Sequence, residues 1–283
     1  MYLSSTGAAG ELMLLNMSTP TDGFPTSLGS VEPDRIRLLG HDLTEELMGR
    51  VGFGELAFWL VAMRRPGEGE LRVFEAVLVA LADHGFTPTA IAARLTYHSA
   101  PDALQGAMAA GLLGCGSRYL GVTEDTGRFL AAALATASSG GGPAPRTDEE
   151  WDAVALQAVT RAHEAGQRVP GLGHPVHKQG DPRTPVLIAL AEEEGVRGRH
   201  LRLFEAVGRV APRVLGRELP LNGAGVCGAA LADLGFAPEL LRGFALLARA
   251  AGVLGHIAEE QRRPVGGALY RTVEENTRYV DPE

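Results

Sequence analysis

The segment Pro170-Gly-Leu-Gly-His-Pro-Val-His-Lys-Gln-Gly-Asp-Pro-Arg183 separates two helical patterns and carries an unusual set of polar side chains. Two histidines, one lysine, one aspartate and one arginine lie within its last ten residues. Its glycines permit a close approach of the backbone to a ligand, and successive backbone N–H groups hold anions. The segment therefore predicts a loop between helices that binds phosphate or carboxylate groups.

Two side chains of this loop have candidate roles. Arg183 offers a planar, two-pronged donor to a carboxylate, and His174 is an acid/base candidate. His174 and His177 also have a spacing found in metal ligands, but no third ligand is indicated, so we predict no metal site. The alternative is a solvated loop whose polar groups cap the neighbouring helices.

Helical patterns extend outward from the loop in both directions. Thr147 with Glu150 forms a capping box that predicts the start of a helix ending near Gly166. Thr87 followed by Pro88 predicts another start, and a weaker capping box lies between Ser99 and Asp102. Further helices are predicted over residues 70–84, 102–114, 184–194, 200–215 and 238–261. We find no convincing strand pair, and the predicted fold class is all-α.

The helix predicted over 70–84 has the clearest period. One face carries five apolar residues, which are Leu71, Phe74, Val77, Leu78 and Leu81. The pattern ends at Asp83-His84-Gly85, where His84 is either a capped end group or a functional residue. Residues 223–228 match the letters of a dinucleotide motif, but no strand precedes them, and we interpret the match as coincidence.

The composition is that of a globular protein and excludes several classes. The chain has 283 residues, 45% of them hydrophobic, and a net charge of −8. These values argue against a disordered chain and against a general nucleic-acid binder. No apolar run is long enough to predict a membrane span, and two cysteines make no disulfide framework. We expect a cytoplasmic protein. Lys178 is its only lysine.

Two low-complexity segments suggest the domain organisation. Residues 1–30 are rich in Ser, Thr, Gly and Pro and are expected to form a flexible arm. Residues 138–146, Ser-Ser-Gly-Gly-Gly-Pro-Ala-Pro-Arg, are the clearest linker. We therefore predict a large helical domain, residues 31–137 and 221–283, and a smaller helical domain, residues 147–220.

Four ordered segments resemble the citrate synthase superfamily. Gly-Leu-Gly-His174 with Gly180-Asp-Pro-Arg183 is similar to its signature loop, and Ala82-Asp-His84-Gly to its upstream histidine segment. Residues 247–264 resemble its C-terminal helix, and residues 40–43 with 53–58 its N-terminal helices. The short length and residues 101–106 look most like citryl-CoA lyases of this superfamily.

The resemblance implies a fold, an assembly and a site. It implies a homodimer whose smaller domain closes over coenzyme A, with no bound cofactor and with an acyl-CoA and a di- or tricarboxylate as substrates. The implied substrate-binding residues are His84, His174, Arg183, Arg249 and Arg263, the last reaching in from the partner subunit. The implied coenzyme A-binding residues are Gly171, Leu172, Gly173, His177 and Lys178.

The chain departs from the family pattern at two positions. Ala224 stands where the family has a catalytic aspartate, and the second catalytic histidine falls at Tyr119 or Leu120. The resemblance thus implies His174 and Tyr119 as catalytic residues. The missing carboxylate disfavours removal of a methyl proton from acetyl-CoA, whereas cleavage of citryl-CoA begins at a hydroxyl proton.

Three functions are therefore open. The first is cleavage of citryl-CoA to acetyl-CoA and oxaloacetate, with His174 as the base for the hydroxyl proton. The second is condensation in the manner of citrate synthase, which Ala224 argues against. The third is a catalytically silent relative that binds coenzyme A or a polycarboxylate.

Overall fold

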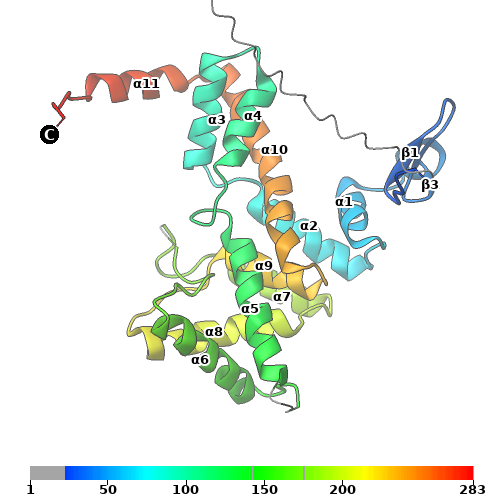
Figure 1. The fold of residues 1–283 in the computed structure, drawn as a ribbon, viewed down its shortest axis with the longest axis vertical. Coiled ribbons are helices and arrows are strands. Elements are labelled where there is room, and N and C mark those ends of the chain that lie inside the picture. The colour runs from blue at the N-terminus through cyan, green and yellow to red at the C-terminus, as the bar shows by residue number, and fades with distance from the viewer. Residues whose placement is uncertain (1–22, 140, 142, 175, 283) are drawn as a thin grey trace, which may run out of the picture. The chain divides into compact units, whose positions relative to one another are not determined.

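The computed structural model describes residues 23–139, 141, 143–174 and 176–282, and the chain is mostly helical there (Figure 1). The predicted all-α class is confirmed. By its contacts the chain divides into two compact units, Met1–Gly52 and Phe53–Glu283. Most of the predicted N-terminal arm, residues 1–22, lies outside the described residues.

The first unit holds a small antiparallel sheet that the sequence did not predict. Its strands are β1 (Gly29–Val31), β2 (Ile36–Leu38) and β3 (His41–Asp42), in the order β1-β2-β3. A π-helix, η1 (Leu43–Leu47), follows and is capped by Asp42. The expectation of no strand pair was wrong, because strands of two or three residues are too short to produce a recognisable alternation.

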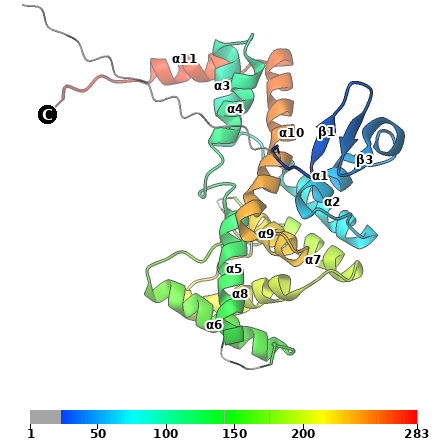
Figure 2. The same cartoon turned by 45° about the vertical axis from the view of Figure 1, so that its right-hand side comes forward.

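The second unit is built from helices. They are α1 (Phe53–Ala62), α2 (Glu68–Ala82), α3 (Pro88–Ser99), α4 (Leu104–Leu113), α5 (Val122–Ser139), α6 (Asp148–Glu164), α7 (Arg183–Glu193), α8 (Arg199–Leu215), α9 (Gly223–Asp233), the 3₁₀-helix η2 (Pro238–Leu240), α10 (Leu241–Arg262) and α11 (Gly266–Glu275). Helix α10 packs along α2, α3 and α4, and α5 packs against α9 (Figure 1 and Figure 2).

The core of this unit forms around α2. The predicted apolar face of α2 is largely buried, with Phe74, Val77 and Leu81 almost inaccessible to solvent. Phe74 meets Phe58 and Phe244 edge to face, with ring centroids 5.4 and 5.2 Å apart. Such aromatic packing adds to the burial of apolar area. The C-terminal end of α2 is thereby fixed beside α10.

Helix boundaries follow the capping signals where the caps are complete. Thr87 accepts a hydrogen bond from the Ala90 N–H, and Thr147 and Glu150 form the predicted capping box. The box expected between Ser99 and Asp102 is wrong. Ser99 is instead the last residue of α3, and α4 begins only at Leu104, with no side-chain cap.

Helix α9 was not predicted, because glycine-rich segments have low helix propensity. Close packing explains the glycines that resemble a dinucleotide motif. A Cβ at Gly223 would clash with Arg183, one at Gly225 would lie 2.6 Å from Gly171 Cα, and one at Gly228 would clash with the Thr123 carbonyl. Helices α5 and α11 were not predicted either.

The segment Pro238–Arg262 is long and apolar enough to cross a membrane by length and composition alone. In the structure its helix packs against α2, α3, α4 and α5, and 44% of its most apolar window is buried. This is the environment of a core helix.

The predicted linker lies between α5, which ends at Ser139, and α6, which begins at Asp148. Residues 140 and 142 fall outside the described part of the chain. Because residues 53–283 form one compact unit, the division into a large and a small domain stays a prediction.

Candidate active site

Most of the residues predicted to bind or react with substrate line one cavity of about 690 Å³. Its walls come from the end of α2, the turn before α5, the loop before α7, the start of α9, and α10. The predicted residues that line it are His84, Tyr119, Gly171, Leu172, Gly173, His174, Lys178, Arg183 and Arg249, and Ala224 lines it as well.

Two arginines of the cavity cap the C-terminal end of α2. Arg183 Nη1 donates to the Ala80 carbonyl at 3.0 Å, and Arg249 donates to the Leu81 carbonyl through Nε at 3.1 Å and Nη2 at 3.0 Å. The last carbonyls of a helix have no partners within it, and cations stabilise this negative end. The helix end therefore orients both guanidinium groups.

Arg183 is also held by a two-pronged ion pair. Its Nε and Nη2 atoms donate to the two carboxylate oxygens of Asp181, at 2.9 and 2.7 Å. Asp181 accepts a further bond from the Gly223 N–H at 2.7 Å. Burial opposes the charge on Asp181, but these donors hold its pKa well below the usual range. Arg183, the loop and α9 form one rigid group.

Replacement of Arg183 by lysine should weaken citrate or oxaloacetate binding by at least ~1.5 kcal/mol. A lysine ammonium is a point charge, so it loses the planar, two-pronged pair with Asp181 that orients the side chain in the cavity. Calorimetric titration measures the change. Arg213→Lys, at an exposed position of α8, is the matched control. An unchanged affinity in Arg183→Lys would remove this residue from the site.

Arg249 is 7% exposed, and no carboxylate pairs with it among the residues that the structure describes. Burial lowers its pKa, because the charged form has lost much of its hydration. A buried cation without a counter-ion is costly. Its position on the cavity wall makes this guanidinium group accessible to an anionic partner.

Two histidines lie in contact with each other on the cavity wall. His84 Nε2 and His174 Nε2 are 3.1 Å apart, and the Nδ1 atom of His174 accepts the backbone N–H groups of Val176 and His177. A neutral imidazole that accepts at Nδ1 carries its proton on Nε2. His174 is therefore the donor in this pair and His84 the acceptor.

His177 lies against both of these rings without lining the cavity. Its ring centroid is 4.4 Å from that of His174 and 6.0 Å from that of His84. The three rings place one nitrogen each within 4.8 Å of one another, so His84 supplies the third candidate ligand that the sequence did not indicate. However, the proton on His174 Nε2 and the nearby Arg183 and Arg249 favour an anion here over a metal cation.

Burial lowers the pKa of both His84 and His174, and neighbouring positive groups add to the effect. Both rings should titrate below pH 6.5 in the free protein, since the charged form is disfavoured. The unfolded chain then binds more protons, so the free energy of unfolding rises with pH up to about 6.5. Histidine NMR titration tests this, and midpoints at or above 6.5 would contradict it.

Three exposed cations lie among the residues that line the cavity. They are Lys178, whose binding of coenzyme A stays a prediction, Arg118 and Arg168. Neither arginine was predicted: Arg118 precedes Tyr119 and Arg168 precedes the glycine loop, and a single arginine beside a motif gives no local signal of binding. Among the described residues that line the cavity, Asp125 is the only one with a carboxylate, so positive side chains outnumber negative ones.

The glycine loop is tied to the start of α9. Asn222 caps α9 by accepting from the Gly225 N–H, and its side-chain amide donates to the Gly173 carbonyl at 2.8 Å. Gly171 has a positive φ of 82°, and a Cβ there would lie 2.6 Å from Phe204. This glycine thus makes room for a neighbouring side chain of the protein.

The structure leaves two predicted roles untested. Arg263 follows α10 and does not line the cavity, so its expected role in a partner subunit stays a prediction. Tyr119 lines the cavity and is 49% exposed, and its catalytic role stays a prediction too.

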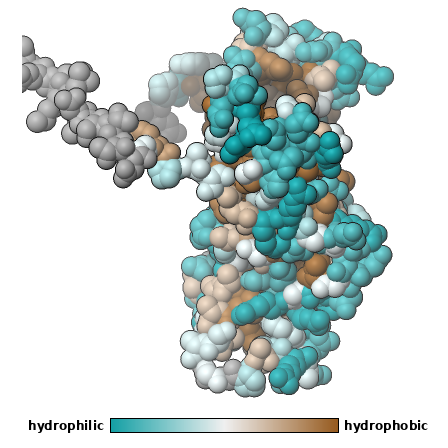
Figure 3. Space-filling view, turned by 90° about the vertical axis from the view of Figure 1, so that its right-hand side faces the viewer, coloured by the Kyte–Doolittle hydropathy of each residue, from teal (hydrophilic) through white to brown (hydrophobic). Residues whose placement is uncertain are grey.

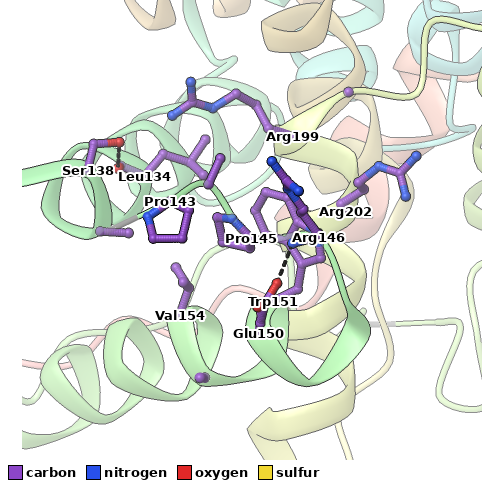
Figure 4. A pocket seen from close by; sticks show the side chains of 14 residues that line it. Leu134, Ser138, Pro143, Pro145, Arg146, Glu150, Trp151, Val154, Arg199 and Arg202 are labelled. Carbon is purple, nitrogen blue, oxygen red and sulfur yellow. Dashed lines mark hydrogen bonds between the residues drawn. The ribbon is translucent and has the colours of Figure 1, made fainter. Parts of the chain in front are cut away.

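The described residues form a second, larger cavity of about 960 Å³ between α5, α6 and α8. Figure 4 shows Arg146, Arg199 and Arg202 around it, with Trp151 and two prolines. No predicted site residue lines this cavity.

Both cysteines are free and buried. Burial raises the pKa of the Cys227 thiol to about 12 and also raises that of Cys115. Neither is suited to nucleophilic catalysis, which uses the thiolate.

Comparisons with known proteins agree on one family. Residues 28–272 match the family model described as citrate synthase, C-terminal domain. The structure resembles citryl-CoA lyase from Hydrogenobacter thermophilus, with a TM-score of 0.78, 28% identity, and coverage of 92% of this chain and 95% of that one. A search of curated protein sequences gives no significant match.

Two further solved structures share the fold. One is ATP citrate lyase from Methanothrix soehngenii in complex with citrate and coenzyme A, with a TM-score of 0.72, 24% identity, and coverage of 92% of this chain and 42% of that one. The other is citrate synthase from Pyrobaculum aerophilum, with a TM-score of 0.57, 20% identity, and coverage of 82% and 52%. The chain belongs to the citrate synthase family.

Proposed function

We propose that this protein is a CoA-dependent carbon–carbon lyase that cleaves citryl-CoA to acetyl-CoA and oxaloacetate. The observation that carries the proposal is the buried Arg249, which lacks a carboxylate partner among the described residues and lies in one cavity with Arg183 and two histidines. A polycarboxylate supplies the negative charge that this arrangement needs. The similarity to the Hydrogenobacter citryl-CoA lyase supports the same substrate class.

The two facing histidines suit the start of a retro-aldol cleavage. The tertiary hydroxyl of citryl-CoA replaces His174 as the partner of His84 Nε2 and donates its proton to that lone pair. The His174 Nε2–H donates a hydrogen bond to the same oxygen as it becomes the carbonyl of oxaloacetate. In this proposal His84 is the base, and not His174 as first expected. The Nδ1 lone pair of His174 already accepts backbone N–H groups, so its Nε2 carries the proton and can only donate.

The carbon–carbon bond breaks as the carbonyl forms, and its electron pair passes to the enolate of acetyl-CoA. One proton then returns to the enolate carbon, so the reaction balances without an oxidant or a reductant. Tyr119 and water in the open cavity are the candidate donors. The rim residues Arg118, Arg168 and Lys178 are placed to hold the phosphates of coenzyme A.

The test is incubation of the protein with citryl-CoA, with oxaloacetate detected through a coupled reduction. Cleavage that depends on Arg249 and His84 is the expected result. Variants at Arg213, on the exposed face of α8, control for unspecific effects of lost charge. Failure of the unmodified protein to cleave citryl-CoA while it still binds citrate would favour the alternative below.

The alternative is a catalytically silent protein that binds coenzyme A or a polycarboxylate. Ala224 favours it, because this side chain lines the cavity where the family has its catalytic carboxylate. Condensation is less favoured for the same reason, since it needs a base for the methyl proton.

We further propose that the protein acts in the cytoplasm as a homodimer whose interface includes α4 and part of α10. These helices expose large apolar side chains, with Leu113 at 86% and Leu254 at 48% exposure. Figure 3 shows hydrophobic residues among hydrophilic ones on one face of the molecule. Light scattering should give the mass of a dimer. A stable monomer at micromolar concentration would contradict this prediction.

A further inference from the structure

The turn that carries His84 has no helical support of its own. Helix α2 ends at Ala82, and α3 begins only at Pro88. Between them Asp83 is extended and Gly85 has a positive φ of 69°. The position of His84 in the cavity therefore depends on what holds its neighbours.

Asp83 holds the turn from the N-terminal side. Its Oδ2 accepts the Gly85 N–H at 2.9 Å, which closes the turn around His84. Its Oδ1 lies 2.9 Å from Nε2 of His256, on α10. Asp83 itself is half exposed, so the buried His256 ring is the rigid partner of this pair.

Phe86 holds the turn from the other side. Its ring lies 4.7 Å from the Arg94 guanidinium carbon, an arrangement in which a cation attracts the ring face. It also meets the His256 ring edge to face, with centroids 5.7 Å apart. Asp83 and Phe86 thus both contact His256, and Phe86 contacts Arg94 as well.

These two side chains are deeply anchored. Arg94 is fully buried, and its Nε donates to Nδ1 of His256 at 3.1 Å. Arg94 Nη1 donates to Glu260 at 3.0 Å, and Glu260 accepts the N–H groups of Val265 and Gly266. Because His256 accepts at Nδ1, its proton lies on Nε2 and points to Asp83.

We propose that His256, fixed by Arg94, is a positioning residue that sets the place of His84 in the carboxylate site through Asp83. Neither His256 nor Arg94 lines the cavity, so both act through the turn that carries His84 and not on the ligand. The inference rests on the proposed function for its substrate, but the geometry of the turn can be tested without any substrate.

Two amide variants of equal charge separate the positioning role from simple loss of packing. The amide of His256→Gln reaches the place of Nε2 and keeps a donor for Asp83. The amide of His256→Asn reaches only the place of Nδ1 and loses that donor. Citrate affinity, measured by calorimetry, should fall about tenfold in His256→Asn and stay within about twofold in His256→Gln, as for other groups that orient a binding residue.

The imidazole NMR signal of His84 in the ligand-free protein gives the second readout. We assign it by its loss in His84→Gln. It should shift or broaden in His256→Asn and keep its position in His256→Gln. If the unmodified protein binds no citrate, the proposed function fails, and this signal still decides whether His256 positions His84.

A third variant covers the case in which His256→Asn does not fold. Phe86 is 56% exposed, so Phe86→Ala leaves the core intact while it frees the turn. Phe53→Ala, at a 71% exposed ring of α1, is the matched control. The His84 signal should change in the first and not in the second. The same signal in His256→Asn or Phe86→Ala as in the unmodified protein would overturn the proposal.

Discussion

Replacement of Arg249 by methionine should nearly abolish citrate binding while the protein stays folded. Loss of one partner of a buried, hydrogen-bonded charge pair costs about 2 to 5 kcal/mol of binding free energy, which is roughly 30-fold to several thousand-fold in affinity. In the proposed complex Arg249 is one such partner, and a ligand carboxylate is the other.

Stability should respond far less than binding. The substitution removes a buried charge that has no carboxylate partner in the described part of the chain, and this favours folding. It also leaves the Leu81 carbonyl without its two donors. The two effects oppose each other, so the melting temperature of the ligand-free protein should change little. What should disappear is the increase in melting temperature that citrate produces in the unmodified protein.

Calorimetry with citrate and thermal unfolding with and without citrate measure both parts. Arg213→Met removes an exposed arginine of α8 and serves as the control for lost charge. Full citrate affinity in Arg249→Met would mean that the buried guanidinium group serves only to cap α2, and the carboxylate site would have to be placed elsewhere.

Introduction of a carboxylate at position 224 should change the chemistry instead of the binding. Ala224→Asp is expected to speed the exchange of acetyl-CoA methyl protons with deuterated water by about 100-fold or more, the usual effect of a placed general base. Oxaloacetate or an unreactive analogue has to be present, so that the second substrate site is filled.

The structure offers room and charge for this change. Ala224 lines the cavity in the first turn of α9, where a negative side chain is favoured by the helix dipole. Arg183 lies beside the neighbouring Gly223 and stabilises the ionised form. Ala132→Asp, on an exposed part of α5, is the matched control and should leave the exchange rate unchanged.

The unmodified protein distinguishes the remaining possibilities. It should cleave citryl-CoA yet exchange methyl protons slowly, because cleavage begins at the hydroxyl. Fast exchange without the substitution would show that another residue is the base and that Ala224 is no defect. Neither cleavage nor exchange in either protein would favour the silent relative.

The predicted fold follows the sequence where local signals are complete. Thr87 with Pro88 and Thr147 with Glu150 start helices as expected, since each side chain satisfies a backbone donor that is otherwise free. Helix α9 has no such local support beyond Asn222. Its glycines are explained only by the neighbours that touch them, and these neighbours are distant in sequence.

The site shows the same limit. His174 and Arg183 were candidates from the loop residues alone, the resemblance implied substrate-binding roles for His84 and Arg249, and all four residues line one cavity in the structure. The capping of α2 by both arginines and the proton position on His174 could not be predicted. These depend on carbonyl groups and backbone N–H groups whose directions exist only in the folded chain.

The rim lysine gives this protein an unusual chemical property. Lys178 is the only lysine in 283 residues, and it is exposed beside the cavity. A reagent that acylates lysine amines therefore attaches a fluorophore or a crosslinker at a single known side chain. Arginine and histidine provide the other basic side chains, and neither gives a stable acylated product in this way. A ligand whose phosphates cover the rim would protect this amine, so the extent of labelling, read by mass spectrometry, reports directly on occupancy of the cavity.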